Sequence, residues 1–257
     1  MKMNKKQIRC LAAGLMLALG AGFWGCALLG GNDPLKTLSY VRDDNRPATS
    51  LIVFLKGRSG NHESFAEEGF VADVWDRGLL FDMMAPDAHI GYYFAETLVP
   101  RLKADVIDPA RARGVERIWL VGVSMGGLGS LMYLRTHPGD LAGVCLIAPF
   151  LGYQKIVKEV SDAGGVRKWN PGTYDPDDDW ERMFWDWLKT YAGSPGSWPP
   201  VYLGYGGEDD FTLAQGMLSD ILPRDRVFVI DGGHDPATMK ALWGRFLDAG
   251  GLGTPAR

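Results

Sequence analysis

Cysteine and histidine are scarce in this chain, which has three cysteines and four histidines among 257 residues. Cys10 and Cys26 stand in an apolar N-terminal segment, so only Cys145 belongs to the part that is expected to fold. These counts exclude a disulfide framework, and no cysteines or histidines have the spacing of a zinc site. Cys145 lies in an apolar run and is expected to be a small buried core residue.

The chain also lacks an excess of positive charge. It has 27 lysines and arginines against 31 aspartates and glutamates, a formal net charge of −4. Because a nucleic-acid surface needs basic residues in excess, we expect no nucleic-acid partner. There is no internal repeat and no low-complexity tract. A hydrophobic fraction of 46% at this length predicts a single domain with a full core, over residues 36–257.

The longest apolar run lies at the N-terminus. Residues 1–9 are basic and residues 10–29 almost wholly apolar, the layout of a bacterial-type secretory signal, so residues 1–30 are predicted to be a targeting segment. Cys26 stands where a lipid-modified cysteine would, after the apolar run. Cleavage near residues 18–20 and an uncleaved membrane anchor are the alternatives. Each of the three predicts an exported protein, periplasmic or attached to the membrane through its N-terminus.

A Gly-x-Ser-x-Gly pattern stands between a strand-like run, residues 118–123, and a helix-like segment that begins at Met125. A serine hydroxyl is a weak nucleophile, and a sharp strand-to-helix turn exposes it at the top of a sheet. Gly122 and Gly126 suit such a turn, which leaves no room for side chains two residues either side of the serine. The pattern predicts that Ser124 is a nucleophile; the alternative is a glycine-rich turn with a capping serine.

Strand-like and helix-like segments alternate along the rest of the chain. Strands are predicted at 51–56, 79–85, 117–122, 143–148, 201–205 and 227–230, and helices at 65–77, 93–113, 125–136, 211–222 and 236–249. Near-continuous apolar strands separated by helices predict an α/β fold, a mostly parallel sheet with helices on both faces. Residues 36–42 are expected to add an antiparallel edge strand.

Residues 151–200 interrupt this alternation and contain five of the nine tryptophans: Trp169, Trp180, Trp185, Trp187 and Trp198. Such a segment is too long for a simple connection, so a helical, tryptophan-rich insertion is predicted. It is either a lid that forms an aromatic wall over the serine or a segment whose tryptophans pack it against the sheet. The acidic run at 175–179 is expected to be a solvated turn, because no histidine and no EF-hand glycine spacing accompanies it.

A nucleophilic serine needs a base, and His234 is the predicted one; the alternative is a loop histidine that caps the next helix. It follows the last strand in a loop with two glycines, at the carboxyl edge of the sheet. His62 and His89 lie in loops that follow earlier strands. His137 closes the helix that starts at the nucleophile turn, and a 12-residue helix holds it about 18 Å from Ser124.

A carboxylate must orient the histidine, and three adjacent acids follow the strand at 201–205. Asp209 is the predicted partner, because a short turn after Gly206 would direct its carboxylate toward His234. Asp210 and then Glu208 are the alternatives. The chain order serine, aspartate, histidine is that of the α/β-hydrolase arrangement.

From about residue 51 to residue 247 the chain resembles the α/β-hydrolase-fold serine hydrolases of esterase and lipase type. The matching segments are 55–60, 122–127, 206–209 and 233–234. The family usually has His-Gly in the first of these, where this chain has Lys56-Gly57, and a local salt bridge is one role open to Lys56. The resemblance implies that the backbone N–H groups of Arg58 and Met125 form the oxyanion hole. It also implies that a lid follows the strand ending near Ala148.

The expected function is hydrolysis of a carboxylic ester or thioester through an acyl-enzyme on Ser124, with no metal and no organic cofactor. The expected substrate is a small molecule with an apolar acyl or aromatic group. Because this fold hosts several activities, three alternatives stay open. They are a peptidase or amidase, a lyase or cofactor-free peroxidase that uses the same triad, and a catalytically silent membrane-attached binding protein.

Overall fold

The computed structural model describes residues 31–42 and 48–253. The predicted targeting segment, including Cys26, lies outside the described residues, so export and lipidation stay predictions. No helix in the described ranges is long and apolar enough to cross a membrane.

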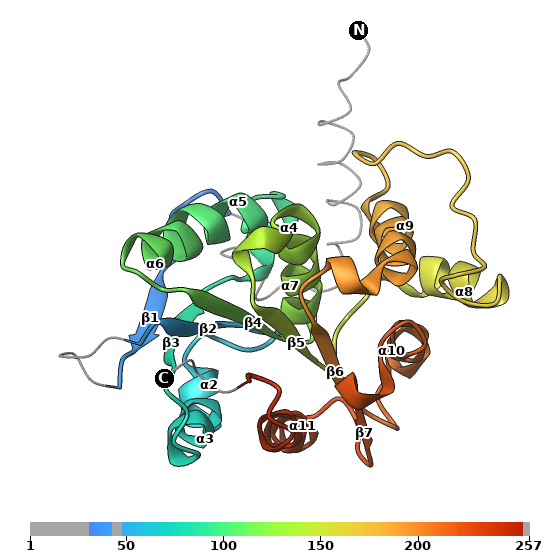
Figure 1. The fold of residues 1–257 in the computed structure, drawn as a ribbon. Helices are drawn as coiled ribbons and strands as arrows, with labels where there is room; N and C mark the ends of the chain where they lie inside the picture. Colours follow the sequence, from blue (N-terminus) through green and yellow to red (C-terminus); the bar gives the residue numbers. More distant parts are fainter. Residues whose placement is uncertain (1–30, 43–47, 254–257) are drawn as a thin grey trace, which may run out of the picture.

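The described residues form a seven-stranded sheet in the order β1-β3-β2-β4-β5-β6-β7 (Figure 1). The strands are β1 (Thr37–Tyr40), β2 (Ser50–Leu55), β3 (Asp82–Pro86), β4 (Arg117–Val123), β5 (Gly143–Ile147), β6 (Val201–Gly206) and β7 (Val227–Ile230). β1 pairs antiparallel with β3, and the other neighbouring strands are parallel. The predicted mostly parallel sheet with an antiparallel edge strand is therefore confirmed.

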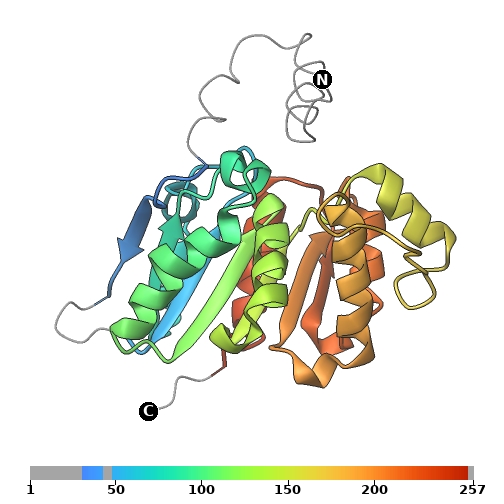
Figure 2. The same ribbon diagram turned by 90° about the horizontal axis from the view of Figure 1, so that it is seen from above.

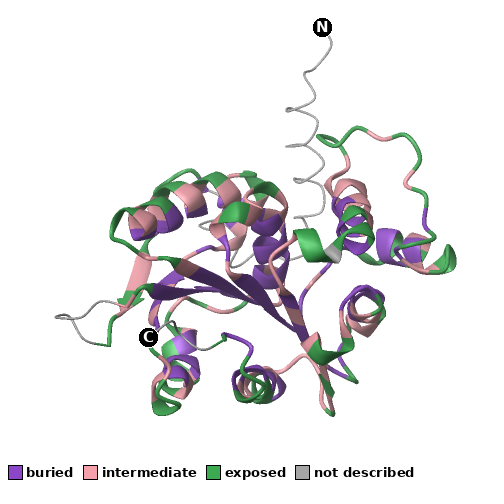
Figure 3. Ribbon diagram, in the orientation of Figure 1, coloured by how far each residue is buried: buried purple, intermediate pink, exposed green. Residues whose placement is uncertain are grey.

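Helices cover both faces of the sheet. One face carries α4 (Ile90–Phe94), α5 (Leu98–Leu102), α6 (Asp108–Ala112) and α7 (Met125–Thr136), and the other carries α2 (Ser64–Glu67), α3 (Phe70–Asp76) and α11 (Pro236–Asp248). Alternate residues of β2 belong to two separate hydrophobic clusters, one under each layer of helices. Central strands buried on both faces must be apolar throughout, and β2 and β5 are buried along their whole length (Figure 3).

Two predicted helices are divided. The segment predicted as one helix at 65–77 forms α2 and α3, because Gly69 between them has a left-handed backbone with φ of 78°. The segment predicted at 93–113 breaks after α4, where Glu96 has φ of 58°. It then runs through α5, a π-helical turn over residues 103–107 and α6. Pro109 follows that turn and supplies no N–H to the helix, which accounts for the irregularity.

The insertion forms α8 (Gln154–Asp162) and α9 (Trp180–Gly193), with α9 over the part of the sheet that contains β6 (Figure 2). Trp169, Trp185 and Trp187 are buried in the same cluster as strand residues of the sheet. For these three tryptophans the burial supports the packing interpretation over the aromatic-wall interpretation. In the acidic run, Asp179 caps α9 by accepting a hydrogen bond from the Arg182 N–H at 3.0 Å.

Cys145 is buried in β5, as predicted, and burial raises the pKa of its thiol. α10 (Thr212–Ser219) completes the helices, and the described residues include no cluster of side chains that would hold a metal ion.

Trp243 of α11 tests the core between α11 and α3. Its ring is fully buried and stacked on Phe70 and Phe246, and its Nε1–H donates to the Phe70 carbonyl at 3.1 Å. We expect Trp243→Ala to lower the free energy of unfolding by about 3–5 kcal/mol, measured by urea denaturation. Leu80→Ala, at a side chain that is 57% exposed, is the control and should change it by less than about 0.5 kcal/mol. Equal losses in the two variants would contradict this assignment of the core.

Candidate active site

Ser124 occupies a sharp turn between β4 and α7. Its backbone is strained, with φ of 51° and ψ of −115°. A Cβ on Gly126 would overlap the carbonyl oxygen of Leu55, and a Cβ on Gly122 would overlap that of Gly126. The two glycines of the pattern are therefore required by close backbone contacts, as the sequence predicts.

Backbone hydrogen bonds fix the turn to its neighbours. The Ser124 N–H donates to the Ile147 carbonyl at 2.9 Å. The Ser124 carbonyl accepts from the N–H groups of Gly127 at 2.9 Å and Phe150 at 3.0 Å. The backbone hydrogen bonds at the ends of β4 and β5 thus hold Ser124 in its strained conformation.

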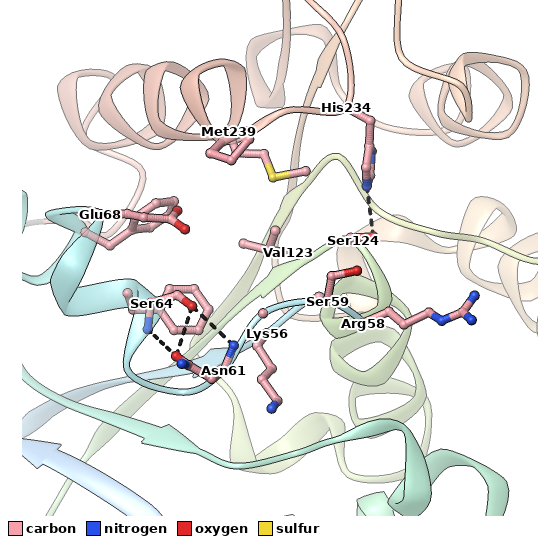
Figure 4. Close-up of a pocket in the computed structure, with 15 residues that line it drawn as sticks. Lys56, Arg58, Ser59, Asn61, Ser64, Glu68, Val123, Ser124, His234 and Met239 are labelled. Carbon is pink, nitrogen blue, oxygen red and sulfur yellow. Dashed lines mark hydrogen bonds between the residues drawn. The ribbon is translucent and has the colours of Figure 1, made fainter. Parts of the chain in front are cut away.

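The structure brings Ser124, His234 and Asp209 together. His234 Nε2 lies 3.0 Å from Ser124 Oγ (Figure 4). On the other side of the ring, His234 Nδ1 lies 2.8 Å from Asp209 Oδ2. An ionised Asp209 only accepts hydrogen bonds, so the imidazole proton is assigned to Nδ1. The lone pair of Nε2 then faces the serine hydroxyl, which is the arrangement that a general base requires.

Asp209 is distinguished from its acidic neighbours by burial. Its side chain is fully buried, whereas Glu208 and Asp210 are exposed. Burial opposes ionisation, but hydrogen bonds from His234 and from the Phe211 N–H, at 2.8 Å, outweigh it and hold the pKa of Asp209 below its usual range. Asp209 is therefore a buried carboxylate that stays ionised beside the imidazole.

The loop that carries His234 is itself fixed. Asp235 caps α11, where its carboxylate accepts the Thr238 N–H at 3.0 Å and the Thr238 hydroxyl at 2.7 Å. A Cβ on Gly206, at the end of β6, would overlap the Gly232 carbonyl oxygen, so the two loops touch through backbone alone. This contact carries Asp209 and His234 toward each other.

The other three histidines serve elsewhere. His89 caps α4 by accepting the Gly91 N–H at 3.1 Å, and the ring of His137 lies 5.2 Å from that of Tyr133, at the far end of α7. His62 Nδ1 lies 3.7 Å from the carboxylate of Asp87.

The two predicted oxyanion donors belong to segments that adjoin Ser124. Met125 is the first residue of α7, and N–H groups in the first turn of a helix have no acceptor within it. Arg58 follows Gly57 in the loop after β2, and a Cβ on Gly57 would lie 3.2 Å from the Cβ of Ser124. This loop and the start of α7 therefore approach the serine from two directions.

Sequence reasoning missed Asp87, the partner of Lys56. Lys56 is buried with its side chain pointing away from Ser124 (Figure 4), and its Nζ lies 2.6 Å from Asp87 Oδ1. Asp87 follows β3, the parallel neighbour of β2, so the carboxyl ends of two adjacent strands meet here. That adjacency is the signal that would have found it. The ion pair attaches the loop carrying Arg58 to the end of β3.

A cavity of about 390 Å³ opens beside Ser124, between the β2–α2 loop and the start of α11. Phe65, Phe70, Val123 and Met239 give it apolar walls, and Ser64 and Glu68 are among its polar groups (Figure 4). Burial, followed by the charge of Glu67, raises the pKa of Glu68. None of the tryptophans of the insertion lines this cavity.

Solved structures with this architecture include a fluorophosphonate-binding serine hydrolase of Staphylococcus aureus. It has a TM-score of 0.58 at 14% identity, covering 86% of this chain and 99% of that one. Est1E of Butyrivibrio proteoclasticus has a TM-score of 0.56 at 14% identity, with 84% and 94% covered. A monoacylglycerol lipase of Paleococcus ferrophilus has a TM-score of 0.51 at 15% identity, covering 84% of this chain and 100% of that one.

No family model and no curated protein sequence matches this chain. The structural neighbours nevertheless superpose on more than four-fifths of its length, with TM-scores above 0.5. The chain has the α/β-hydrolase fold, as predicted from its sequence.

The ion pair of Lys56 and Asp87 gives a stability prediction. Lys56→Met leaves a carboxylate without its charged partner, and we expect a loss of about 2 kcal/mol in the free energy of unfolding at neutral pH, measured by urea denaturation. Lys158→Met is the control, because the Lys158–Asp162 pair is exposed on α8 and should contribute less than about 0.5 kcal/mol.

The effect of Lys56→Met should depend on pH. Burial opposes ionisation of Asp87, but the hydrogen bond and charge of Lys56 hold its pKa below the ordinary value of 3.8. The ion pair contributes its full stabilisation above the ordinary pKa of Asp87, and this contribution is lost as the pH falls through the lowered pKa of the folded state. As the pH falls through this lowered pKa, the difference in free energy of unfolding between wild type and Lys56→Met should narrow. A difference that persists in strong acid would contradict the assignment of the ion pair.

Proposed function

We propose that this protein is a serine hydrolase that cleaves a carboxylic ester or thioester through an acyl-enzyme on Ser124. The observation that carries the proposal is the continuous chain from Ser124 Oγ through His234 to Asp209, with separations of 3.0 and 2.8 Å. It stands on a strained turn that opens into a cavity. A capping serine in an ordinary turn would need neither the strain nor the buried carboxylate.

The mechanism follows from these positions. His234 Nε2 accepts the hydroxyl proton as Ser124 Oγ attacks the carbonyl carbon, and Asp209 stabilises the imidazolium that forms. The N–H groups of Arg58 and Met125 hold the oxyanion, and one such donor is worth about 10²–10³ in turnover. The leaving alcohol takes the proton from His234. Water, activated by the same imidazole, then releases the acid and restores the serine.

The neighbours support an ester as the substrate. They include a fluorophosphonate-binding serine hydrolase, a monoacylglycerol lipase, and Est1E, which is also solved with ferulic acid bound. Fluorophosphonates react with serines that a neighbouring base activates. For this chain we propose a small-molecule ester with an apolar acyl or aromatic group.

Replacement of the nucleophile tests the proposal. We expect the full chain to hydrolyse p-nitrophenyl esters and to be labelled by a fluorophosphonate probe, and Ser124→Ala to lose both, because the hydroxyl that forms the acyl-enzyme is removed. Ser161→Ala, in α8, is the matched control and should retain both. Turnover or labelling that survives in Ser124→Ala would contradict the proposed nucleophile, and a folded wild type inactive in both assays would contradict the function.

The choice of carboxylate has its own test. Asp209→Asn keeps the shape of the side chain but removes the charge that supports the imidazolium and its tautomer, so kcat should fall by about 10³–10⁴. Asp210→Asn, at the exposed neighbour, should change kcat by less than about twofold. Steady-state turnover of one short ester by both variants checks this, and the reverse ranking would transfer the role to Asp210.

A further inference from the structure

Three aromatic residues form a connected cluster next to the proposed triad. The ring of Phe211 lies 5.1 Å from that of His234, edge to face. Phe150 lies 5.5 Å from Phe211, and Tyr153 lies 5.4 Å from Phe150. We call Phe150, Tyr153 and Phe211 the aromatic flank. The rings contact one another edge to face, starting at the imidazole of His234 and ending at the solvent-exposed ring of Tyr153.

The sheet order places the aromatic flank opposite the cavity. Ser124 follows β4, which lies between β2 and β5. The cavity is bounded by the loop after β2, whereas Phe150 follows β5 and Phe211 follows β6. An ester carbonyl held at Ser124 therefore has two different surroundings for its two substituents, the cavity on one side and an open aromatic surface on the other.

The backbone of the aromatic flank is bonded directly to the triad. The Phe150 N–H donates to the Ser124 carbonyl at 3.0 Å, and the Phe211 N–H donates to Asp209 Oδ1 at 2.8 Å. These bonds fix the backbone from which two of the rings extend, and the ring contacts with each other and with His234 complete a surface that needs no ligand to form. A preorganised surface loses little conformational entropy on binding.

These three rings stay partly or largely exposed to solvent. Tyr153 is 58% exposed and Phe150 and Phe211 are only partly buried, whereas Trp169, Trp185 and Trp187 nearby in the sequence are buried in the core. Large aromatic rings that stay exposed beside a reactive group are typical of ligand-binding surfaces.

We propose that the aromatic flank binds the apolar part, aryl or alkyl, of the ester whose carbonyl is attacked by Ser124, and that the cavity receives the other part. This inference rests on the proposed function and deepens it. It assigns selectivity for the apolar group to Phe150, Tyr153 and Phe211 rather than to the tryptophans of the insertion. Each methylene that such a surface covers adds to transition-state binding, up to about fourfold in kcat/KM when it is fully buried.

The experiment compares two series of esters with the full chain. One series extends the acyl group from p-nitrophenyl acetate to the octanoate, and the other extends the alcohol from ethyl acetate to octyl acetate, with acid release recorded by titration. In wild type we expect kcat/KM to rise along one series. The rise identifies which half of the ester lies on the aromatic flank.

Tyr153→Ala is the informative variant, because an exposed side chain can be removed without loss of folding. We expect the ratio of kcat/KM for the longest to the shortest ester to fall about fivefold, the value of one aromatic contact. Tyr153→Phe keeps the ring and should keep the ratio. Phe94→Ala is the matched control, since Phe94 is 59% exposed on α4, which follows β3 on the other side of β4.

The failures of the two proposals are distinguishable. Suppose that short esters are cleaved only when Ser124 is present, but that Tyr153→Ala, Tyr153→Phe and Phe94→Ala all keep the wild-type ratio of kcat/KM for the longest to the shortest ester. The proposed function then survives, and the proposed role of the aromatic flank is wrong. The same holds if Tyr153→Ala changes the association state of the protein in size-exclusion chromatography with the ratio unaltered, because the rings then cover a protein contact. If wild type cleaves no ester of either series, the proposed function fails and this inference fails with it.

Discussion

The candidate active site depends on one close backbone contact, between the end of β2 and the start of α7. A side chain at Gly126 would collide with the Leu55 carbonyl, so the nucleophile turn and the loop that carries Arg58 share one boundary without side chains between them. Moving β2 outward by the width of a methyl group would separate the predicted oxyanion donors of Arg58 and Met125. Lys56 and Asp87 act on the same boundary, because their ion pair fixes the loop to the next strand.

Sequence alone predicted those parts of the fold and site that are determined locally. The parallel sheet followed from apolar strands between helices, and the strained turn followed from Gly122 and Gly126, whose spacing is a property of the turn itself. Asp209 was chosen among three adjacent acids because of the turn after Gly206. The structure adds the reason, which is that only this acid is buried beside His234.

What sequence reasoning did not find depends on contacts between distant segments. Asp87 meets Lys56 only because β3 pairs with β2. Phe150 and Phe211 are brought together by the pairing of β5 with β6, and neither residue stands out in its own segment. The tryptophan-rich composition of the insertion leaves open both a wall over the serine and packing against the sheet, because composition does not tell a buried ring from an exposed one. Tertiary packing buries Trp169, Trp185 and Trp187 in the core.

Cys145 is the one free cysteine in the described part of the chain, and it is buried. The thiol lies in β5, next to the central strand β4, with both faces of the sheet covered, and burial raises its pKa. Because the thiolate is the form that reacts, oxidants and alkylating agents act on Cys145 only when β5 leaves the sheet. The rate at which Cys145 is modified therefore reports how often the sheet opens to the unfolded state.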